Sequence, residues 1–164
     1  MLTSHVVGQI AVIGIGATAV MDAWLALLSR LGVPTTSFAM VGRWVGHFAR
    51  GRFRHAAIAR AAPIRYEFAL GWLIHYAIGI AYAAMLVITM GADWMAQPTA
   101  WPALAIGIVT VAAPWFVMQP AMGAGIAATR TPTPLKNALR SLANHAVFGL
   151  GLYLAAEAIT KVVG

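Results

Sequence analysis

Four apolar stretches of the sequence each contain one polar side chain that could take part in chemistry: Asp22, His75, Gln119 and His145. Counted from the end that adjoins the arginine-rich loops, each lies eight to ten residues into its stretch. At about 1.5 Å per helical residue this is a depth of about 12–15 Å. One polar residue per helix at one depth predicts a polar layer inside the bundle, to which Asn144 and Thr18 would belong. Because lipid penalises charge, ionisable groups at such depth are functional candidates.

This polar layer has three interpretations, of which two involve chemistry and one is purely structural. Two imidazoles and a carboxylate can bind a transition metal, and two histidines can be axial ligands of haem, so His75, His145 and Asp22 are a candidate metal set. Alternatively, Asp22 is the titrating residue of a small proton-coupled transporter, with Pro114 and Pro120 kinking the third stretch. In the interpretation that we favour, the layer only sets helix register in a non-enzymatic structural or accessory protein.

The sequence leans against an enzyme and assigns no catalytic residue. It contains no Gly-x-Ser-x-Gly elbow, no P-loop and no His-Glu-x-x-His motif. The absence of cysteine removes thiolate nucleophiles and Cys-ligated metals. Since there are only four acidic residues, general acid–base chemistry would have to combine Asp22 with a histidine.

The elements that must position the layer are four membrane-spanning helices. Hydrophobic residues make up 61 % of the chain and charged residues 9 %, whereas soluble domains have about 25 % charged residues. A soluble globular domain is therefore excluded. We predict an all-α fold, an integral membrane four-helix bundle forming a single transmembrane domain of residues 1–164. Its spans, each long enough for a hydrocarbon core of about 30 Å, are predicted at about 5–31, 67–90, 100–129 and 137–160.

The basic residues predict an orientation and a set of partners. Ten of the 11 Lys and Arg residues lie at or between the first and second spans or the third and fourth. The positive-inside rule puts these loops in the cytoplasm and both termini outside. The net charge of +7 then requires no nucleic acid. The expected partners are the lipid bilayer, with anionic lipid at the cytoplasmic loop, and a homodimer is a further candidate.

The longer basic loop, residues 32–66, contains a predicted interfacial helix at about 37–49. Its apolar residues recur at helical spacing: Phe38, Val41, Trp44, Val45 and Phe48. Basic residues take the opposite side. This pattern is typical of an amphipathic helix lying on anionic lipid. The basic residues predicted to face lipid in this loop are Arg43, Arg50, Arg52 and Arg54.

The order of motifs suggests two parallel helical-hairpin repeats. The second and fourth spans share His-x-x-x-Gly, at residues 75–79 and 145–149. The first and third spans share Ile-Gly-Ile, at residues 13–15 and 106–108. Parallel repeats are known in membrane folds. The alternative interpretation is coincidence in a chain rich in Ala, Gly and Val.

Several segments resemble a family of bacterial integral membrane proteins of unknown function, DUF2938. The segments that carry the resemblance are GIGATAVMD (14–22), VGRWVGH (41–47), RGRFRH (50–55), GWLIHYAIG (71–79), APWFVMQP (113–120) and HAVFGLGLY (145–153). The resemblance covers nearly the whole chain and implies a small multi-pass inner-membrane protein. It implies no activity and therefore lends no catalytic residue, and a haem or transition-metal cofactor stays open.

Overall fold

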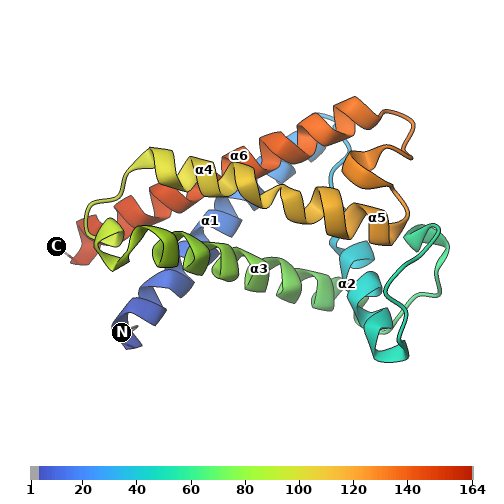
Figure 1. Ribbon diagram of the computed structural model, residues 1–164, viewed down its shortest axis with the longest axis horizontal. Helices are drawn as coiled ribbons and strands as arrows, with labels where there is room; N and C mark the ends of the chain where they lie inside the picture. Colours follow the sequence, from blue (N-terminus) through green and yellow to red (C-terminus); the bar gives the residue numbers. More distant parts are fainter. Residues whose placement is uncertain (1–3, 164) are drawn as a thin grey trace. The chain divides into compact units, whose positions relative to one another are not determined.

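The computed structural model describes residues 4–163, and all regular structure in that range is helical (Figure 1). The α-helices are α1 (Ser4–Arg30), α2 (Phe38–Gly46), α3 (Glu67–Met90), α4 (Ala100–Thr110), α5 (Gln119–Met122) and α6 (Pro134–Val163). A π-helical turn, Pro114–Met118, precedes α5. Short 3-10 turns occur at His47–Arg50, Ile58–Arg60, Ala92–Met95 and Ile126–Ala128. The all-α prediction is confirmed.

Four helical segments are long and apolar enough to cross a membrane: Ser4–Arg30, Glu67–Met90, Ala100–Met122 and Pro134–Lys161. The third ends earlier than predicted, because Gly123 takes a φ of +97°, a left-handed conformation that terminates helices. The fourth begins three residues earlier than predicted, at Pro134. Proline suits the first helical position, where its missing N–H would have no helical partner. The membrane character predicted from composition therefore agrees with the helices that form.

The third span contains the one π-helical turn of the described chain, and this turn lies between two prolines. Pro114 begins the turn and Pro120 follows it inside α5. A proline cannot donate a backbone hydrogen bond, so the regular α-helical ladder is interrupted at both positions. The kink expected from the sequence is thus accommodated as a widened turn, a feature that often accompanies functional sites.

The helices fall into two compact units. Among the described residues, unit 1 comprises 4–34, 76–110 and 143–163, and unit 2 comprises 35–75 and 111–142. The single domain predicted for residues 1–164 stays a prediction. Helices α3 and α6 each contribute one part to each unit.

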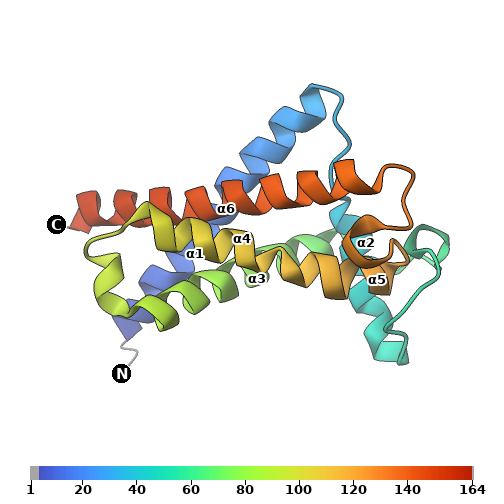
Figure 2. The same cartoon turned by 45° about the horizontal axis from the view of Figure 1, so that its top comes forward.

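Unit 1 has a continuous apolar core made by helix faces at three- and four-residue spacing. The buried residues are Ile10, Ile13 and Ala17 of α1, Ala83, Leu86 and Val87 of α3, Trp94 and Met95 of the turn Ala92–Met95, Ala103 of α4, and Phe148, Leu152 and Ala156 of α6. Within this unit α4 runs beside α6 in both views (Figures 1 and 2). The apolar periodicity of each span therefore selects the face that meets its neighbours.

Glycines bring the helices of unit 1 into backbone contact, and they do so twice with the same motifs. A Cβ built on Gly14 of Ile-Gly-Ile would lie 3.0 Å from the Gly79 carbonyl oxygen of His-x-x-x-Gly. A Cβ on Gly107, the glycine of the second Ile-Gly-Ile, would lie 2.6 Å from Gly149 Cα of the second His-x-x-x-Gly. Both contacts are too close for any side chain. This correspondence supports the two helical-hairpin repeats over coincidence.

A threonine follows the glycine of each Ile-Gly-Ile motif and donates a hydrogen bond to the carbonyl oxygen of that glycine. Thr18 Oγ1 donates to Gly14 O at 2.7 Å, and Thr110 Oγ1 donates to Gly107 O at 2.7 Å. Both threonines are buried. A hydroxyl that bonds back to its own helix can be buried without an unpaired donor, so it fits at a close helix crossing.

We predict that Gly107→Ala lowers the thermal unfolding midpoint of the detergent-purified protein. The added Cβ would lie 2.5 Å from His145 O and 2.6 Å from Gly149 Cα, and forcing these backbones apart should cost about 1–3 kcal/mol. Gly8→Ala is the matched control, because nothing lies within 4 Å of its Cβ position in the same kind of helix. An unchanged midpoint for Gly107→Ala would contradict the close α4–α6 contact.

Candidate functional site

Unit 1 contains polar side chains that pair across helices. Tyr76 OH donates to Asp22 Oδ2 at 2.8 Å, and Trp24 Nε1 donates to Asn144 Oδ1 at 3.0 Å. The third pair joins Thr110 Oγ1 and His145 Nδ1 at 3.0 Å. These three contacts, called here the polar pairs, connect α1 with α3, α1 with α6, and α4 with α6. They place three of the predicted polar residues in specific contacts.

The geometry around His145 defines which ring nitrogen carries a proton. The Thr110 hydroxyl has one hydrogen, which it donates to Gly107 O, so its oxygen accepts from His145 Nδ1–H. In a neutral ring the lone pair is then on Nε2, the atom that a metal or haem iron would need. The ring also faces Tyr82, with a distance of 6.4 Å between ring centroids.

The remaining residues of the predicted layer have different surroundings. Thr18 is fully buried, and a Cβ on Gly79 would collide with its hydroxyl, so it is a packing residue at the α1–α3 crossing. His75 belongs to unit 2, where its ring lies 4.2 Å from that of Phe38 and 5.7 Å from that of Trp72. Gln119 also belongs to unit 2. The single polar layer formed by all of them stays a prediction.

Two polar atoms at the π-helical turn are buried without a partner in the part of the chain that the structure describes. They are Gln119 Oε1 and Trp115 Nε1, one an acceptor and the other a donor. Separately, no group of three or more His, Cys, Asp or Glu side chains within residues 4–163 could hold a metal ion. The metal set of Asp22, His75 and His145 and the haem pair stay predictions.

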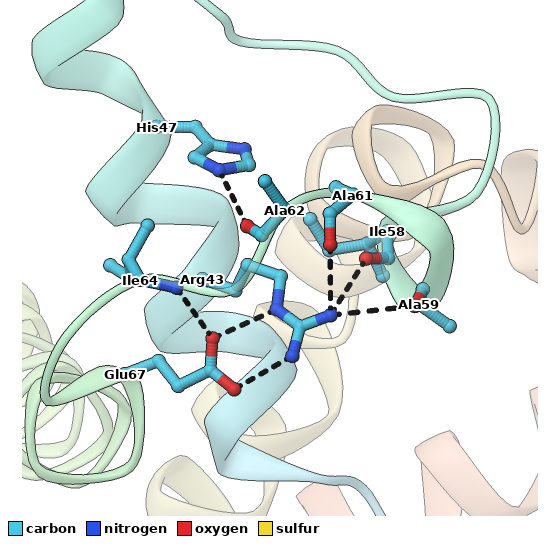
Figure 3. Close-up of polar contacts among 8 residues, drawn as sticks. All are labelled: Arg43, His47, Ile58, Ala59, Ala61, Ala62, Ile64 and Glu67. Atoms are coloured by element: carbon cyan, nitrogen blue, oxygen red, sulfur yellow. Dashed lines mark hydrogen bonds and ion pairs between the residues drawn. The ribbon is translucent and has the colours of Figure 1, made fainter.

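The centre of unit 2 is a buried ion pair between Arg43 of α2 and Glu67, the first residue of α3 (Figure 3). Arg43 Nη2 lies 2.7 Å from Glu67 Oε1, and Arg43 Nε lies 2.8 Å from Oε2. Such a two-point contact is the strongest arrangement that these groups can form. Arg43 is only 7 % exposed, and hydrogen bonding to Glu67 raises the pKa of its guanidinium. The pair is therefore charged and largely enclosed by protein, with 8 % of the Arg43 side chain and 19 % of the Glu67 side chain exposed.

Backbone groups complete this ion pair. Arg43 Nη1 donates to three carbonyl oxygens of one loop, those of Ile58, Ala59 and Ala61, at 3.2–3.4 Å. Glu67 Oε2 accepts from the backbone N–H of Ile64 at 3.1 Å. Together these bonds hold residues 58–67 against α2, as Figure 3 shows. The loop that precedes the second span is thus organised around one arginine.

Close backbone packing brings the ion pair together. A Cβ on Gly42 would lie 2.6 Å from Gly71 N, so α2 crosses the first turns of α3 at van der Waals distance. The rings of Phe38 and Trp72 pack beside this crossing, with centroids 4.7 Å apart. Arg43 follows Gly42 directly and Glu67 lies one turn before Gly71, so the crossing sets their side chains side by side.

One site prediction from the sequence is wrong. Arg43 was expected to face lipid on the polar side of an interfacial helix, but its side chain points into the protein and binds Glu67. The helix itself is confirmed as α2 and the following turn, which together span residues 38–50. The pattern misled because a basic face can be buried when a carboxylate and carbonyls are available to it. The sequence signal for this burial was Glu67, because no other acidic residue lies in or beside either arginine-rich loop.

A histidine pair lies next to the ion pair. His47 is 1 % exposed, with Nε2 3.0 Å from Ala62 O and Nδ1 2.7 Å from His55 Nε2. With His47 neutral, Nε2–H donates to the carbonyl and Nδ1 accepts from His55. This leaves His55 Nδ1 as a buried atom with no partner among the described residues. Burial, and then the charges of His47 and Arg52, lower the pKa of His55.

Comparison with known proteins gives a family and nothing more. Residues 11–159 match a family described as "Protein of unknown function (DUF2938)". The match covers most of the chain and agrees with the resemblance noted in its segments. Neither a curated protein nor a solved structure matches the chain.

We predict that Arg43→Gln destabilises the folded protein strongly. It leaves Glu67 enclosed without its cation, a loss of about 3–5 kcal/mol for a buried pair. The matched control is Lys161→Gln, which breaks an exposed pair of 3.9 Å with Glu157 and should change stability by about 0.5 kcal/mol or less. Chemical denaturation in detergent measures both. Equal effects of the two variants would show that the Arg43–Glu67 pair is not buried.

We also predict that stability falls as the pH drops from 7.5 to 5, in part through His55. The unfolded chain binds a proton on His55 near the ordinary pKa of 6.5, whereas the folded chain binds it only at lower pH. The unfolded state then holds more protons in this window, so protonation favours unfolding. His55→Gln should weaken the fall in thermal midpoint, while His5→Gln, at an exposed position, should not. Identical pH profiles for wild type and His55→Gln would disprove the effect.

Proposed function

The chain belongs to DUF2938, a family of unknown function, and from its own geometry we propose that it is a non-enzymatic structural or accessory membrane protein. The observation that carries this proposal is the set of polar pairs in unit 1, in which each side chain is bonded to one from another helix. Residues used in this way specify how helices fit together. They need no substrate to explain their presence.

The energetics of helix association in lipid support this role. Apolar helix faces gain little by leaving lipid for one another, so close packing and interhelical hydrogen bonds must supply the preference. Each such bond contributes about 0.6–2 kcal/mol. In unit 1 the polar pairs add to the glycine contacts Gly14–Gly79 and Gly107–Gly149. Both features bear on the same helices, α1 with α3 and α4 with α6.

A proton-coupled transporter is the second candidate, and one observation favours it. Asp22 is an acidic residue within a membrane-spanning helix, where its Oδ2 accepts a hydrogen bond from Tyr76 OH. Ionisable residues within membrane spans often belong to proton pathways.

The orientation belongs to the same proposal. We infer that the two arginine-rich loops lie on the cytoplasmic side of a bacterial inner membrane and that both termini lie outside. The support is the charge distribution, since nine of the 11 basic residues belong to unit 2. Basic residues are retained on the cytoplasmic side during insertion. An accessory role is consistent with polar contacts that join helices of the same chain, namely the polar pairs and the Arg43–Glu67 ion pair.

We predict that Tyr76→Phe lowers the thermal midpoint in detergent. The substitution removes the hydroxyl that donates to Asp22 Oδ2 and should cost about 1–3 kcal/mol. Tyr153→Phe is the matched control on α6, where no hydrogen bond to the hydroxyl is found within the described residues, and it should have little effect. A neutral Tyr76→Phe would count against a structural role of the pair.

The transporter is tested with the same acid. Asp22→Asn keeps an oxygen that can accept from Tyr76 but cannot exchange a proton near neutral pH. For an accessory protein, vesicles containing wild type or Asp22→Asn should show the same passive proton leak under a pH gradient. A proton flux present in wild type and lost in Asp22→Asn, with the thermal midpoint unchanged, would replace our proposal with the transporter.

A further inference from the structure

Unit 2 combines a high positive charge with an almost complete lack of acidic residues. Its nine basic residues face one acidic residue, Glu67, and Arg43 occupies both oxygens of that carboxylate. No acidic side chain of unit 2 remains for the other basic residues, of which seven are exposed and one is half-buried. They are Arg50, Arg52, Arg54, Arg60, Arg65, Arg130, Lys136 and the half-buried Arg140. Counter-charges must come from outside this unit.

Three of these arginines lie on one anchored segment, residues 50–54. Trp44 Nε1 donates to Phe53 O at 2.9 Å, and Arg52 N donates to His47 O at 3.2 Å. The ring of Phe48 lies 5.0 Å from the rings of both Trp44 and Phe53. The backbone of the segment is thus attached to α2 and its following turn. The arginine side chains and Phe53, which is 58 % exposed, project from this anchored backbone.

Residues on either side of this segment are bonded to the ends of two membrane spans. Arg43, on the helix that anchors it, binds Glu67, the first residue of the span Glu67–Met90. Directly after the segment, His55 N donates to Ala121 O at 2.8 Å, one residue before the span Ala100–Met122 ends. Span ends lie at the level of the lipid headgroups. Residues 50–54 are therefore held where headgroups are within reach.

We propose that residues 50–54 form a binding surface for anionic phospholipid headgroups. Arg50, Arg52 and Arg54 contact the phosphate groups, to which guanidinium binds through two parallel hydrogen bonds. Phe53 enters the boundary between headgroups and acyl chains, as aromatic residues do at membrane surfaces. The surface goes beyond the accessory role proposed above and does not depend on it, because a transporter could carry it equally well.

The test is a lipid titration of the full-length protein in an uncharged detergent, read by native mass spectrometry. The probes are phosphatidylglycerol and phosphatidylcholine with the same acyl chains. Wild type should bind phosphatidylglycerol more tightly, and R52Q/R54Q should reduce that affinity about tenfold or more, since each basic residue near a membrane contributes substantially to anionic lipid binding. The matched control R30Q/K161Q removes the same charge from exposed positions in unit 1 and should stay within about twofold.

Further arms identify the ligand and control for folding. R52K/R54K keeps the charge but loses the two-point guanidinium contact, so its affinity for phosphatidylglycerol should lie between those of wild type and R52Q/R54Q. Full wild-type affinity in R52K/R54K would overturn the two-point contact with phosphate. F53S should weaken the binding of phosphatidylglycerol, because Phe53 enters the boundary between headgroups and acyl chains. A free phosphate ion would make no such contact with Phe53. Complete competition by inorganic phosphate would reassign the surface to free phosphate.

Two results would overturn the proposal outright. One is an equal loss of phosphatidylglycerol binding in R52Q/R54Q and R30Q/K161Q, which would mean that net charge alone is measured. The other is tighter binding of a single-stranded oligonucleotide than of phosphatidylglycerol, lost in R52Q/R54Q, which would make nucleic acid the partner. Circular dichroism of each variant at the titration temperature establishes that the helices are intact.

Discussion

A hydrocarbon solvent offers no hydrogen bonds, and this constraint governs both units of the protein. A polar side chain in a membrane-spanning helix is costly unless it finds a partner within the chain or at the membrane surface. In unit 1 Asp22 and His145 meet Tyr76 and Thr110 of other helices. In unit 2 Arg43 takes up both oxygens of Glu67. These bonded polar residues hold helices and loops together.

The arginines of unit 2 are of two kinds, a buried one that organises a loop and exposed ones that form a basic surface. Residue type alone does not distinguish them. Arg43 is buried, and its five hydrogen bonds attach residues 58–67 to α2. The arginines at 50, 52 and 54 are exposed on a segment attached to the same helix. Because the first arginine uses the only carboxylate of the unit, the others are left without an internal counter-ion. An ordered loop and an unpaired basic surface therefore arise from one interaction.

The two predicted hairpin repeats share glycine-to-glycine contacts but differ in the neighbours of their histidines. In both hairpins an Ile-Gly-Ile glycine meets a His-x-x-x-Gly glycine, and a buried threonine bonds back to the first glycine. The histidines have diverged, however. His145 bonds to Thr110, whereas the ring of His75 packs against Phe38 and Trp72. Close helix crossing requires glycine and is hard to change, while a histidine four residues away is free to take a new neighbour.

The sequence by itself determined the all-helical class, the four spans and the presence of α2, because hydropathy and helical periodicity depend on local residue order. It also identified the glycine motifs that make the helix crossings. Only the tertiary structure decided the partners: it bonded Tyr76 to Asp22, Trp24 to Asn144, and Arg43 to Glu67 instead of to lipid. These pairs join residues between 24 and 120 positions apart. Which side chains meet across such distances depends on how helices cross, and no local pattern encodes that.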